Sequence, residues 1–162
     1  VLVSGRENVV DSIKIPLSLA MTYELNKDYQ NAINSYRVLY DLQPENLIVI
    51  NNLASMLSDY GNSEDLQFAK SLVEKLKNSN QPVFLDTVGW VYFKLGDYGN
   101  AMNYLTQAVD KMPDINIFNY HLGMAYKMSG DKAKAKVYLE KSLSGDESFK
   151  EKGLAQSALE DL

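Results

Sequence analysis

The sequence contains no cysteine, which excludes disulfide bridges, thiolate metal ligands and a cysteine nucleophile. Glycine and proline are scarce, with nine and four residues among 162, so the composition is not that of a disordered or collagen-like chain. No apolar run reaches the roughly 18 residues that a membrane-spanning helix needs. A chain without cysteine suits the cytoplasm and the periplasm equally.

Blocks of one charge sign are also missing. The formal net charge is -5, and acidic and basic residues are mixed along the chain, which argues against binding to the phosphate backbone of a nucleic acid. Hydrophobic residues make up 46% of the sequence, including 11 tyrosines and 5 phenylalanines, which is enough to bury a core. The sequence therefore predicts a folded, soluble, single-domain protein.

Candidate catalytic and metal-binding groups are few. The chain has one histidine, His121, and a metal site there would need an oxygen ligand such as Asp86 beside it. A single imidazole is more often a surface contact or a half-buried core residue, so we predict no metal and no cofactor. The carboxylates are scattered without a converging serine, histidine or lysine. The sequence therefore does not predict an enzyme.

What the sequence does contain is a repeat. Residue types recur at a spacing of 34 or 35 positions, and a small residue follows each member of the main apolar series. A larger side chain at that second position would hold the two helices of a repeat apart. The apolar series is Leu19, Leu53, Val88 and Leu122, and the small residues are Ala20, Ala54, Gly89 and Gly123. This pattern predicts stacked pairs of helices.

Each repeat is expected to contain a helix, a tight turn and a second helix. A glycine can end a helix in the left-handed conformation, and the Asp, Asn or Ser that follows can cap the next helix. The second repeat is irregular: we expect an extended turn over 62–65 and a shortened second helix before Pro82. The repeats are 13–46, 47–81, 82–115 and 116–149, and the turns are 26–28, 60–63, 95–97 and 129–131.

Two terminal segments lie outside the four repeats. A helix over 147–162, with a polar outer face, is predicted to cap the last repeat. Residues 1–12 are an N-terminal extension or the remnant of a preceding repeat. Because the chain begins at Val1 without an initiator methionine, we expect it to be part of a longer protein.

The pattern resembles the tetratricopeptide repeat family over about 13–149. The third repeat is the closest to the family pattern, although Leu85 stands where the pattern has tryptophan. The resemblance implies an all-α, right-handed superhelix, or solenoid, of four helix pairs that binds a protein or peptide in its concave groove. The matching residues of the third repeat are Val88, Gly89, Tyr92, Gly96, Tyr98, Ala101, Ala108 and Pro113.

A narrower resemblance rests on the strings NNLASML, LDTVGWVYFKLGDYGNAM and YHLGMAYKMSGDKAKA. They are similar to bacterial repeat proteins associated with exopolysaccharide production and exosortase (PEP-CTERM) sorting. This resemblance implies a partner in export or assembly machinery. It favours a periplasmic location, or membrane anchoring through a segment outside this chain, over the cytoplasm.

In the resembled family, the first helix of each repeat lines the groove at defined positions. Trp90 and Phe93, one helical turn apart, are candidate anchors, although Trp90 can equally pack in the core. Asn51 and Asn52 can bond a partner's backbone or their own neighbours. The family's carboxylate-capturing arrangement is not present in the first repeat. The positions carried over are Asn51, Asn52, Ser55, Asp86, Thr87, Trp90, Phe93, Lys94, Tyr120, His121, Met124, Lys127 and Met128.

The leading hypothesis is a scaffold that holds a protein or peptide segment in this groove. One alternative is self-assembly, suggested by an incomplete N-terminal edge at 1–12. A second alternative is carbohydrate binding, suggested by the mixture of aromatic, amide and carboxylate side chains. Each alternative predicts a different partner: another protein, a second copy of the chain, or a sugar.

Overall fold

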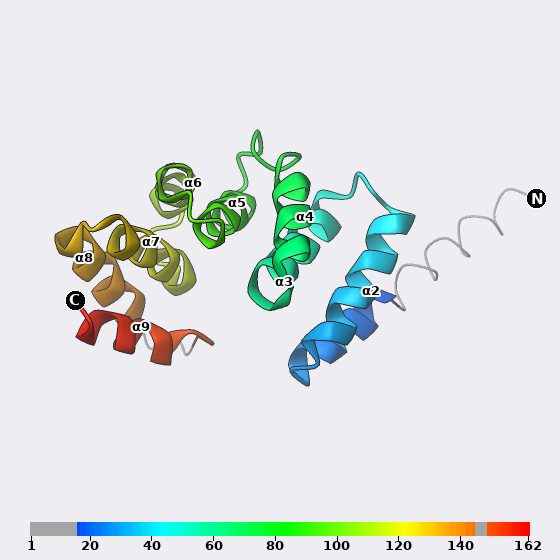
Figure 1. Ribbon diagram of the computed structural model, residues 1–162, viewed down its shortest axis with the longest axis horizontal. Helices are drawn as coiled ribbons and strands as arrows, with labels where there is room; N and C mark the ends of the chain where they lie inside the picture. Colours follow the sequence, from blue (N-terminus) through cyan, green and yellow to red (C-terminus); the bar gives the residue numbers. More distant parts are fainter. Residues whose placement is uncertain (1–15, 145–148) are drawn as a thin grey trace, which may run out of the picture. The chain divides into compact units, whose positions relative to one another are not determined.

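The computed structural model describes residues 16–144 and 149–162. Every regular element within these residues is a helix (Figure 1), so the predicted all-α class is confirmed. The chain divides after Lys75 into two compact parts, which we call the N-terminal part and the C-terminal part. The predicted extension over 1–12 lies outside the described residues.

The N-terminal part contains a helix over 16–25, then α2 (Tyr29–Leu42), α3 (Leu47–Tyr60) and α4 (Ser63–Val73). Helix α2 packs on α3, and α3 packs on α4. With 11 residues, α4 is shorter than the 14-residue helix α2, which confirms the predicted shortening of the second repeat. The first and third helices of this part, 16–25 and α3, therefore correspond to the first helices of the first two repeats.

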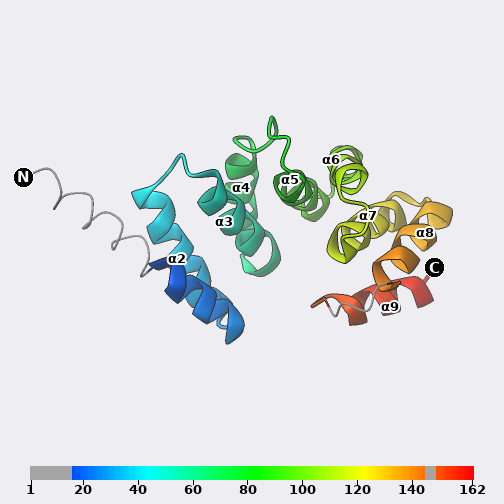
Figure 2. The ribbon, with the colours of Figure 1, turned by 180° about the vertical axis from the view of Figure 1, so that it is seen from behind.

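The C-terminal part contains α5 (Pro82–Lys94), α6 (Tyr98–Lys111), α7 (Asn116–Ser129), α8 (Lys132–Leu143) and α9 (Lys152–Glu160). The closest pairs are α5 with α6 and α7 with α8. Helix α7 also packs on α6 and touches α5, while α9 packs on α8, and Figure 2 shows this order from behind. The first helices of the last two repeats, α5 and α7, thus lie next to one another.

The predicted turns at 26–28, 95–97 and 129–131 are confirmed. Gly96 and Gly130 have φ angles of 80° and 89°, so each helix ends in the left-handed conformation that glycine adopts without strain. The equivalent residue of the first turn is Lys27, with a φ of 58°. In each turn the next residue accepts a backbone N–H from the start of the following helix. These capping residues are Asp28, Asp97 and Asp131.

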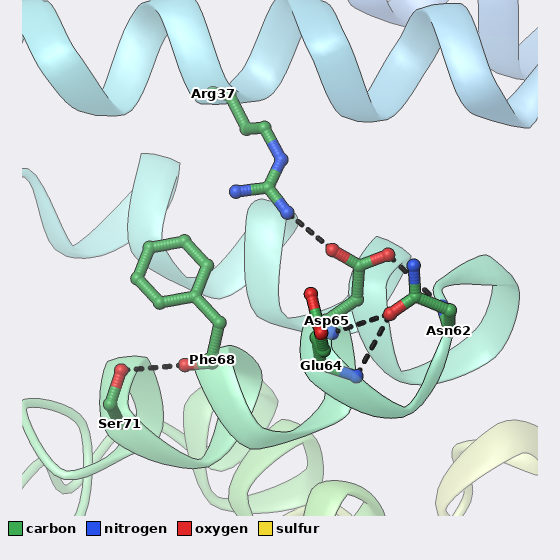
Figure 3. A network of polar contacts seen from close by, with 6 residues as sticks. All are labelled: Arg37, Asn62, Glu64, Asp65, Phe68 and Ser71. Atoms are coloured by element: carbon green, nitrogen blue, oxygen red, sulfur yellow. Dashed lines mark hydrogen bonds and ion pairs between the residues drawn. The ribbon is translucent and has the colours of Figure 1, made fainter.

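The turn between α3 and α4 is tighter than predicted. We expected an extended turn over 62–65, but α4 begins directly after Asn62. The Asn62 side chain accepts from the N–H of Asp65 at 3.0 Å, and the Asp65 carboxylate accepts from the N–H of Asn62 at 3.0 Å (Figure 3). This capping box starts the helix early. At Gly61 a Cβ atom would lie 2.5 Å from the Leu57 carbonyl oxygen, so the tight turn requires glycine.

Arg37 links α2 to α4. Its guanidinium forms an ion pair and hydrogen bond with the Asp65 carboxylate that also caps α4 (Figure 3). The guanidinium carbon lies 5.2 Å from the centre of the Phe68 ring, one turn further along α4. Arg37 therefore fixes the start of the second repeat's second helix against the first repeat.

Close approach of helices explains the small residues of the repeat. A Cβ atom at Gly89 would lie 2.5 Å from Leu105 Cγ, and one at Gly123 would lie 2.9 Å from Leu139 Cγ. Real Cβ contacts are longer than this, so neither position admits alanine without movement of α6 or α8. The packing role predicted for these small residues is confirmed.

The capping helix begins later than predicted. We expected it from residue 147, but α9 starts at Lys152, and 149–151 precede it in a non-helical conformation. Phe149 packs into the apolar cluster of the C-terminal part, with its ring 6.2 Å from that of Tyr120. This contact places the segment before α9 against α7. The predicted start itself lies outside the described residues.

Candidate functional site

Three rings stack on one another between α5 and α7. The Trp90 ring lies 4.5 Å from that of Phe93, at an interplanar angle of 6°, and 3.9 Å from that of His121, at 18°. Phe93 follows Trp90 by three residues on α5, whereas His121 comes from α7. The stack therefore joins the third and fourth repeats.

Asp86 orients the histidine of this stack. The Nδ1 atom of His121 lies 3.0 Å from both carboxylate oxygens of Asp86. Because an ionised carboxylate only accepts, Nδ1 carries a hydrogen and donates it. Asp86 and His121 are 6% and 7% exposed, so this is a buried, charge-assisted contact. Within the residues that the structure describes, no further aspartate or glutamate joins this pair to form a group of three that could hold a metal ion.

Half of the ten residues predicted on α5 and α7 are buried. Trp90 is only 8% exposed, which places its ring in the core cluster, the alternative that the sequence left open. Phe93 and Met124 are half-buried, and Lys94 is exposed, with its Nζ atom 5.4 Å from the centre of the Trp90 ring. The buried members are Asp86, Thr87, Trp90, Tyr120 and His121. A partner at this face would therefore meet the edge of the stack.

Lys127, another of the predicted residues, contacts α9 and the residue that follows it. The ammonium group of Lys127, near the end of α7, donates to the Ala158 carbonyl at 2.9 Å and lies 3.6 Å from the Asp161 carboxylate. Lys127 therefore helps to attach α9. The sequence pattern does not predict this contact, because the partner is a backbone carbonyl 31 positions away.

The two predicted asparagines lie on α3 in the N-terminal part. The Asn51 side-chain nitrogen donates to the Asn52 side-chain oxygen at 3.3 Å. Asn51 is 7% exposed, and its own Oδ1 atom is buried without a hydrogen-bond partner. Ser55, one turn further on, is half-buried. Asn51 therefore has an unmet acceptor on the predicted groove side of α3.

Tyr36 and Glu24, two residues that the sequence analysis did not select, complete this polar cluster. Burial, followed by a hydrogen bond to Glu24, raises the pKa of Tyr36 well above its ordinary value, and a hydrogen bond from Asn52 opposes this shift. Tyr36 is 2% exposed. Glu24 occupies the twelfth position of the first repeat, which is one of the groove positions of the resembled family, so that pattern could have found it.

Comparison with known families agrees with the repeat. A tetratricopeptide repeat model matches residues 17–46, 85–110 and 118–149, which are together more than half of the chain. The chain belongs to the tetratricopeptide repeat family. Tetratricopeptide repeat proteins generally act as scaffolds for protein–protein interaction, and their fold is typically non-enzymatic.

Two curated relatives are similar to this tetratricopeptide repeat chain. A TPR repeat-containing protein of Pseudomonas aeruginosa is 27% identical over 123 residues, which cover 74% of this chain and 20% of the relative. The intraflagellar transport protein 88 homolog of Homo sapiens is 23% identical over 158 residues, which cover 89% of this chain and 19% of the relative. The chain thus spans about a fifth of the length of these relatives.

Solved structures show the same fold. A thermophilic TPR protein of Thermus thermophilus has a TM-score of 0.76 and 17% identity, covering 91% of this chain and 79% of that one. PilW, a type IV pilus biogenesis factor, has a TM-score of 0.69 and 18% identity, covering 98% of this chain and 78% of PilW. The narrower resemblance to proteins of exopolysaccharide production and exosortase sorting is not supported by these comparisons. None of the described helices is long and apolar enough to cross a membrane.

Proposed function

We propose that this tetratricopeptide repeat chain is a scaffold that binds a peptide or protein segment at the first helices of its last two repeats, α5 and α7. The observation that carries the proposal is the stack of Phe93, Trp90 and His121, held by Asp86. The stack is formed without any partner, so binding at its edge costs little ordering of side chains.

Groups at the edge of the stack offer the contacts that a partner needs. Phe93 and Met124 are half-buried apolar side chains, and Lys94 adds an exposed cation beside them. Aromatic residues surrounded by near-neutral contacts often provide most of the binding energy of an interface. Trp90 is buried beneath these side chains. We therefore propose that the partner contacts Phe93, Met124 and Lys94 more than the indole ring of Trp90.

Affinity capture from the source cell tests the proposal. The bait is the wild-type chain, with Phe93→Ala and Lys94→Ala as separate variants, and Lys111→Ala, an exposed lysine on the second helix α6, as the matched control. We expect a protein that is captured by wild type and Lys111→Ala but reduced with both first-helix variants. Equal capture by all four folded baits would reject this face. Separate envelope and cytosolic extracts would test the envelope location.

Self-association is a second candidate, because the first repeat has an uncovered apolar position. Leu19 is 42% exposed, whereas the equivalent residues Leu53, Val88 and Leu122 are fully buried. A second copy could cover this side chain. If it does, the molar mass measured by light scattering rises with concentration for wild type and not for Leu19→Ser. A concentration-independent mass would exclude this candidate.

The arrangement does not favour carbohydrate binding at Trp90. A sugar ring needs an open, flat aromatic face, and the indole is stacked against Phe93 and His121. Titration of the chain with oligosaccharides, monitored by tryptophan fluorescence, should therefore produce no saturable change. A saturable change that Phe93→Ala alters would favour the sugar alternative instead.

A further inference from the structure

Two stacked tyrosine rings of the fourth repeat each have a lysine over them. The rings of Tyr126 on α7 and Tyr138 on α8 are 5.6 Å apart, at an interplanar angle of 12°. The Nζ atom of Lys134 lies 5.0 Å from the centre of the Tyr126 ring, and that of Lys141 lies 5.6 Å from the centre of the Tyr138 ring. Both distances are within the range of cation–π attraction. The rings therefore hold both ammonium groups against the surface of the repeat.

Lys134 and Lys141 share one side of α8 with an exposed apolar residue. Residues three, four and seven positions apart lie on the same side of a helix, so Val137 and Tyr138 stand between the two lysines. Both lysines are exposed, Val137 is 49% exposed, and Tyr138 is half-buried. We call these four residues the α8 face. It combines two cations with a central apolar side chain.

Both ammonium groups of the α8 face can donate to an anion. Lys134 Nζ lies 3.5 Å from the Asp131 carboxylate, whereas a charge-assisted hydrogen bond is about 2.7–2.9 Å long. That carboxylate also accepts from the backbone N–H of Lys134 at 3.1 Å, so it caps α8. Lys141 forms no ion pair with any residue of 16–144 or 149–162. A ligand with two carboxylates can therefore use both lysines.

Helix α8 is basic within an acidic chain. It contains four lysines and one glutamate, whereas the whole chain has a net charge of -5. The equivalent helix of the third repeat, α6, contains one lysine and one aspartate. A short acidic segment would contact α8 alone, while an extended polyanion would also approach the acidic remainder of the chain. The distribution of charge therefore favours a short acidic ligand.

The third repeat has the same ring stack without the two lysines. Its rings, Tyr92 and Tyr104, are 6.0 Å apart at an interplanar angle of 8°. Asn100 and Gln107 stand 34 positions before the two lysines of the α8 face. Lys77, which lies 5.0 Å from the centre of the Tyr92 ring, comes from the segment before α5 instead. Repeat packing therefore explains the stacked rings but does not explain the paired lysines of α8.

We propose that the α8 face binds an acidic segment of a partner protein, with one carboxylate against each lysine and an apolar side chain on Val137. Seven residues of a helix span about 10.5 Å, so the two lysines match acidic residues seven positions apart on a helix that lies along α8. The complementary charges set the position of the segment, and Val137 contributes apolar contact. The inference goes beyond the proposed scaffold face, because it concerns a second surface, on α8 rather than on α5 and α7.

Fluorescence anisotropy with labelled helical peptides and the 162-residue chain tests the inference. The acidic peptide has two glutamates seven positions apart with leucine between them, and the neutral peptide has glutamine in place of both glutamates. We expect the acidic peptide to bind more tightly than the neutral peptide. Lys134→Gln and Lys141→Gln should each weaken the acidic peptide about two- to fivefold, within the range of an exposed ion pair, and leave the neutral peptide unchanged. Equal affinity of the wild-type chain for both peptides would overturn the inference.

Lys136→Gln is the matched control. It removes the same charge from the same helix but on the side opposite Lys134, where the Lys136 ammonium lies 3.9 Å from Glu140. This variant should change the affinity for the acidic peptide less than about twofold, because salt screens exposed charges that do not touch the ligand. Losses of the same size for Lys134→Gln, Lys141→Gln and Lys136→Gln would indicate general charge attraction and contradict the proposed face.

Charge reversal and vesicles complete the experiment. The double variant Lys134→Glu with Lys141→Glu should reject the acidic peptide and bind a peptide that has lysine in place of both glutamates. Vesicles that contain phosphatidylserine should not sediment the wild-type chain. Sedimentation that Lys141→Gln abolishes, without any preference for the acidic peptide, would assign the face to an anionic membrane surface and refute the acidic segment.

Discussion

His121 on α7 donates its Nδ1 hydrogen to Asp86 on α5, with 3.0 Å to each carboxylate oxygen, and both side chains are buried. The His121 ring also stacks on Trp90 of α5, with 3.9 Å between the ring centres. The pair therefore ties the third repeat to the fourth by a contact between their first helices.

We expect Asp86→Ala and His121→Ala each to lower the free energy of unfolding by about 2 kcal/mol, because each leaves a buried polar group without its partner. The double variant should cost less than the sum, with a coupling energy of about 1 kcal/mol or more. Urea denaturation of the four proteins measures this cycle. Additive losses would show that the contact contributes no pairwise stability.

Gly89→Ala should destabilise the chain. Alanine gains about 1 kcal/mol of helix propensity over glycine, but crowding against Leu105, whose backbone nitrogen would lie 3.0 Å from the new Cβ, should cost about 1–3 kcal/mol. Gly99→Ala on α6 is the matched control, since its Cβ would meet only Asp97 Oδ1 at 3.9 Å. Thermal unfolding should therefore shift in opposite directions for the two variants, and a stabilised Gly89→Ala would contradict the close approach of α5 and α6.

Lys27→Gly should stabilise the first turn. The left-handed conformation of Lys27 costs an L-residue about 1–2 kcal/mol, and glycine avoids this cost while adding about 0.5–1 kcal/mol of chain entropy to the unfolded state. The net gain is therefore between zero and about 1.5 kcal/mol. In Gly130→Ala, nothing lies within 4 Å of the new Cβ, so the expected loss reports the backbone conformation alone. A gain for Gly130→Ala in chemical denaturation would refute this account.

Tyr36 should make stability fall at alkaline pH. Its pKa in the folded chain is raised, so the folded state holds the proton more tightly than the unfolded state does. This contribution is complete below the ordinary tyrosine pKa of about 10 and is lost as the pH rises above it. Tyr36→Phe should lower the melting temperature at pH 8, because the interactions of the hydroxyl with Glu24 and Asn52 disappear, but should flatten the decline of the melting temperature above about pH 10. Parallel profiles for wild type and variant would contradict the raised pKa.

Local chemistry explains why the helices and turns could be predicted from the sequence. A residue such as Gly96 followed by Asp97 ends one helix and caps the next through contacts within a few positions. The start of α4 was predicted too late, although it is also set by local contacts. The reciprocal hydrogen bonds of Asn62 and Asp65 form a capping box that the prediction did not include. Neither success nor failure here depended on distant parts of the chain.

The sequence by itself determined the repeat, the helical class and the small residues between paired helices, because periodicity encodes which side of each helix is apolar. Tertiary structure decided which polar groups meet. Trp90 became a buried member of a ring stack only because His121, 31 positions later, lies on the neighbouring helix. Glu24 and Asn52, from two other helices, likewise both shift the pKa of Tyr36. Such contacts depend on the distance and rotation between helices, which the packing of many side chains together establishes.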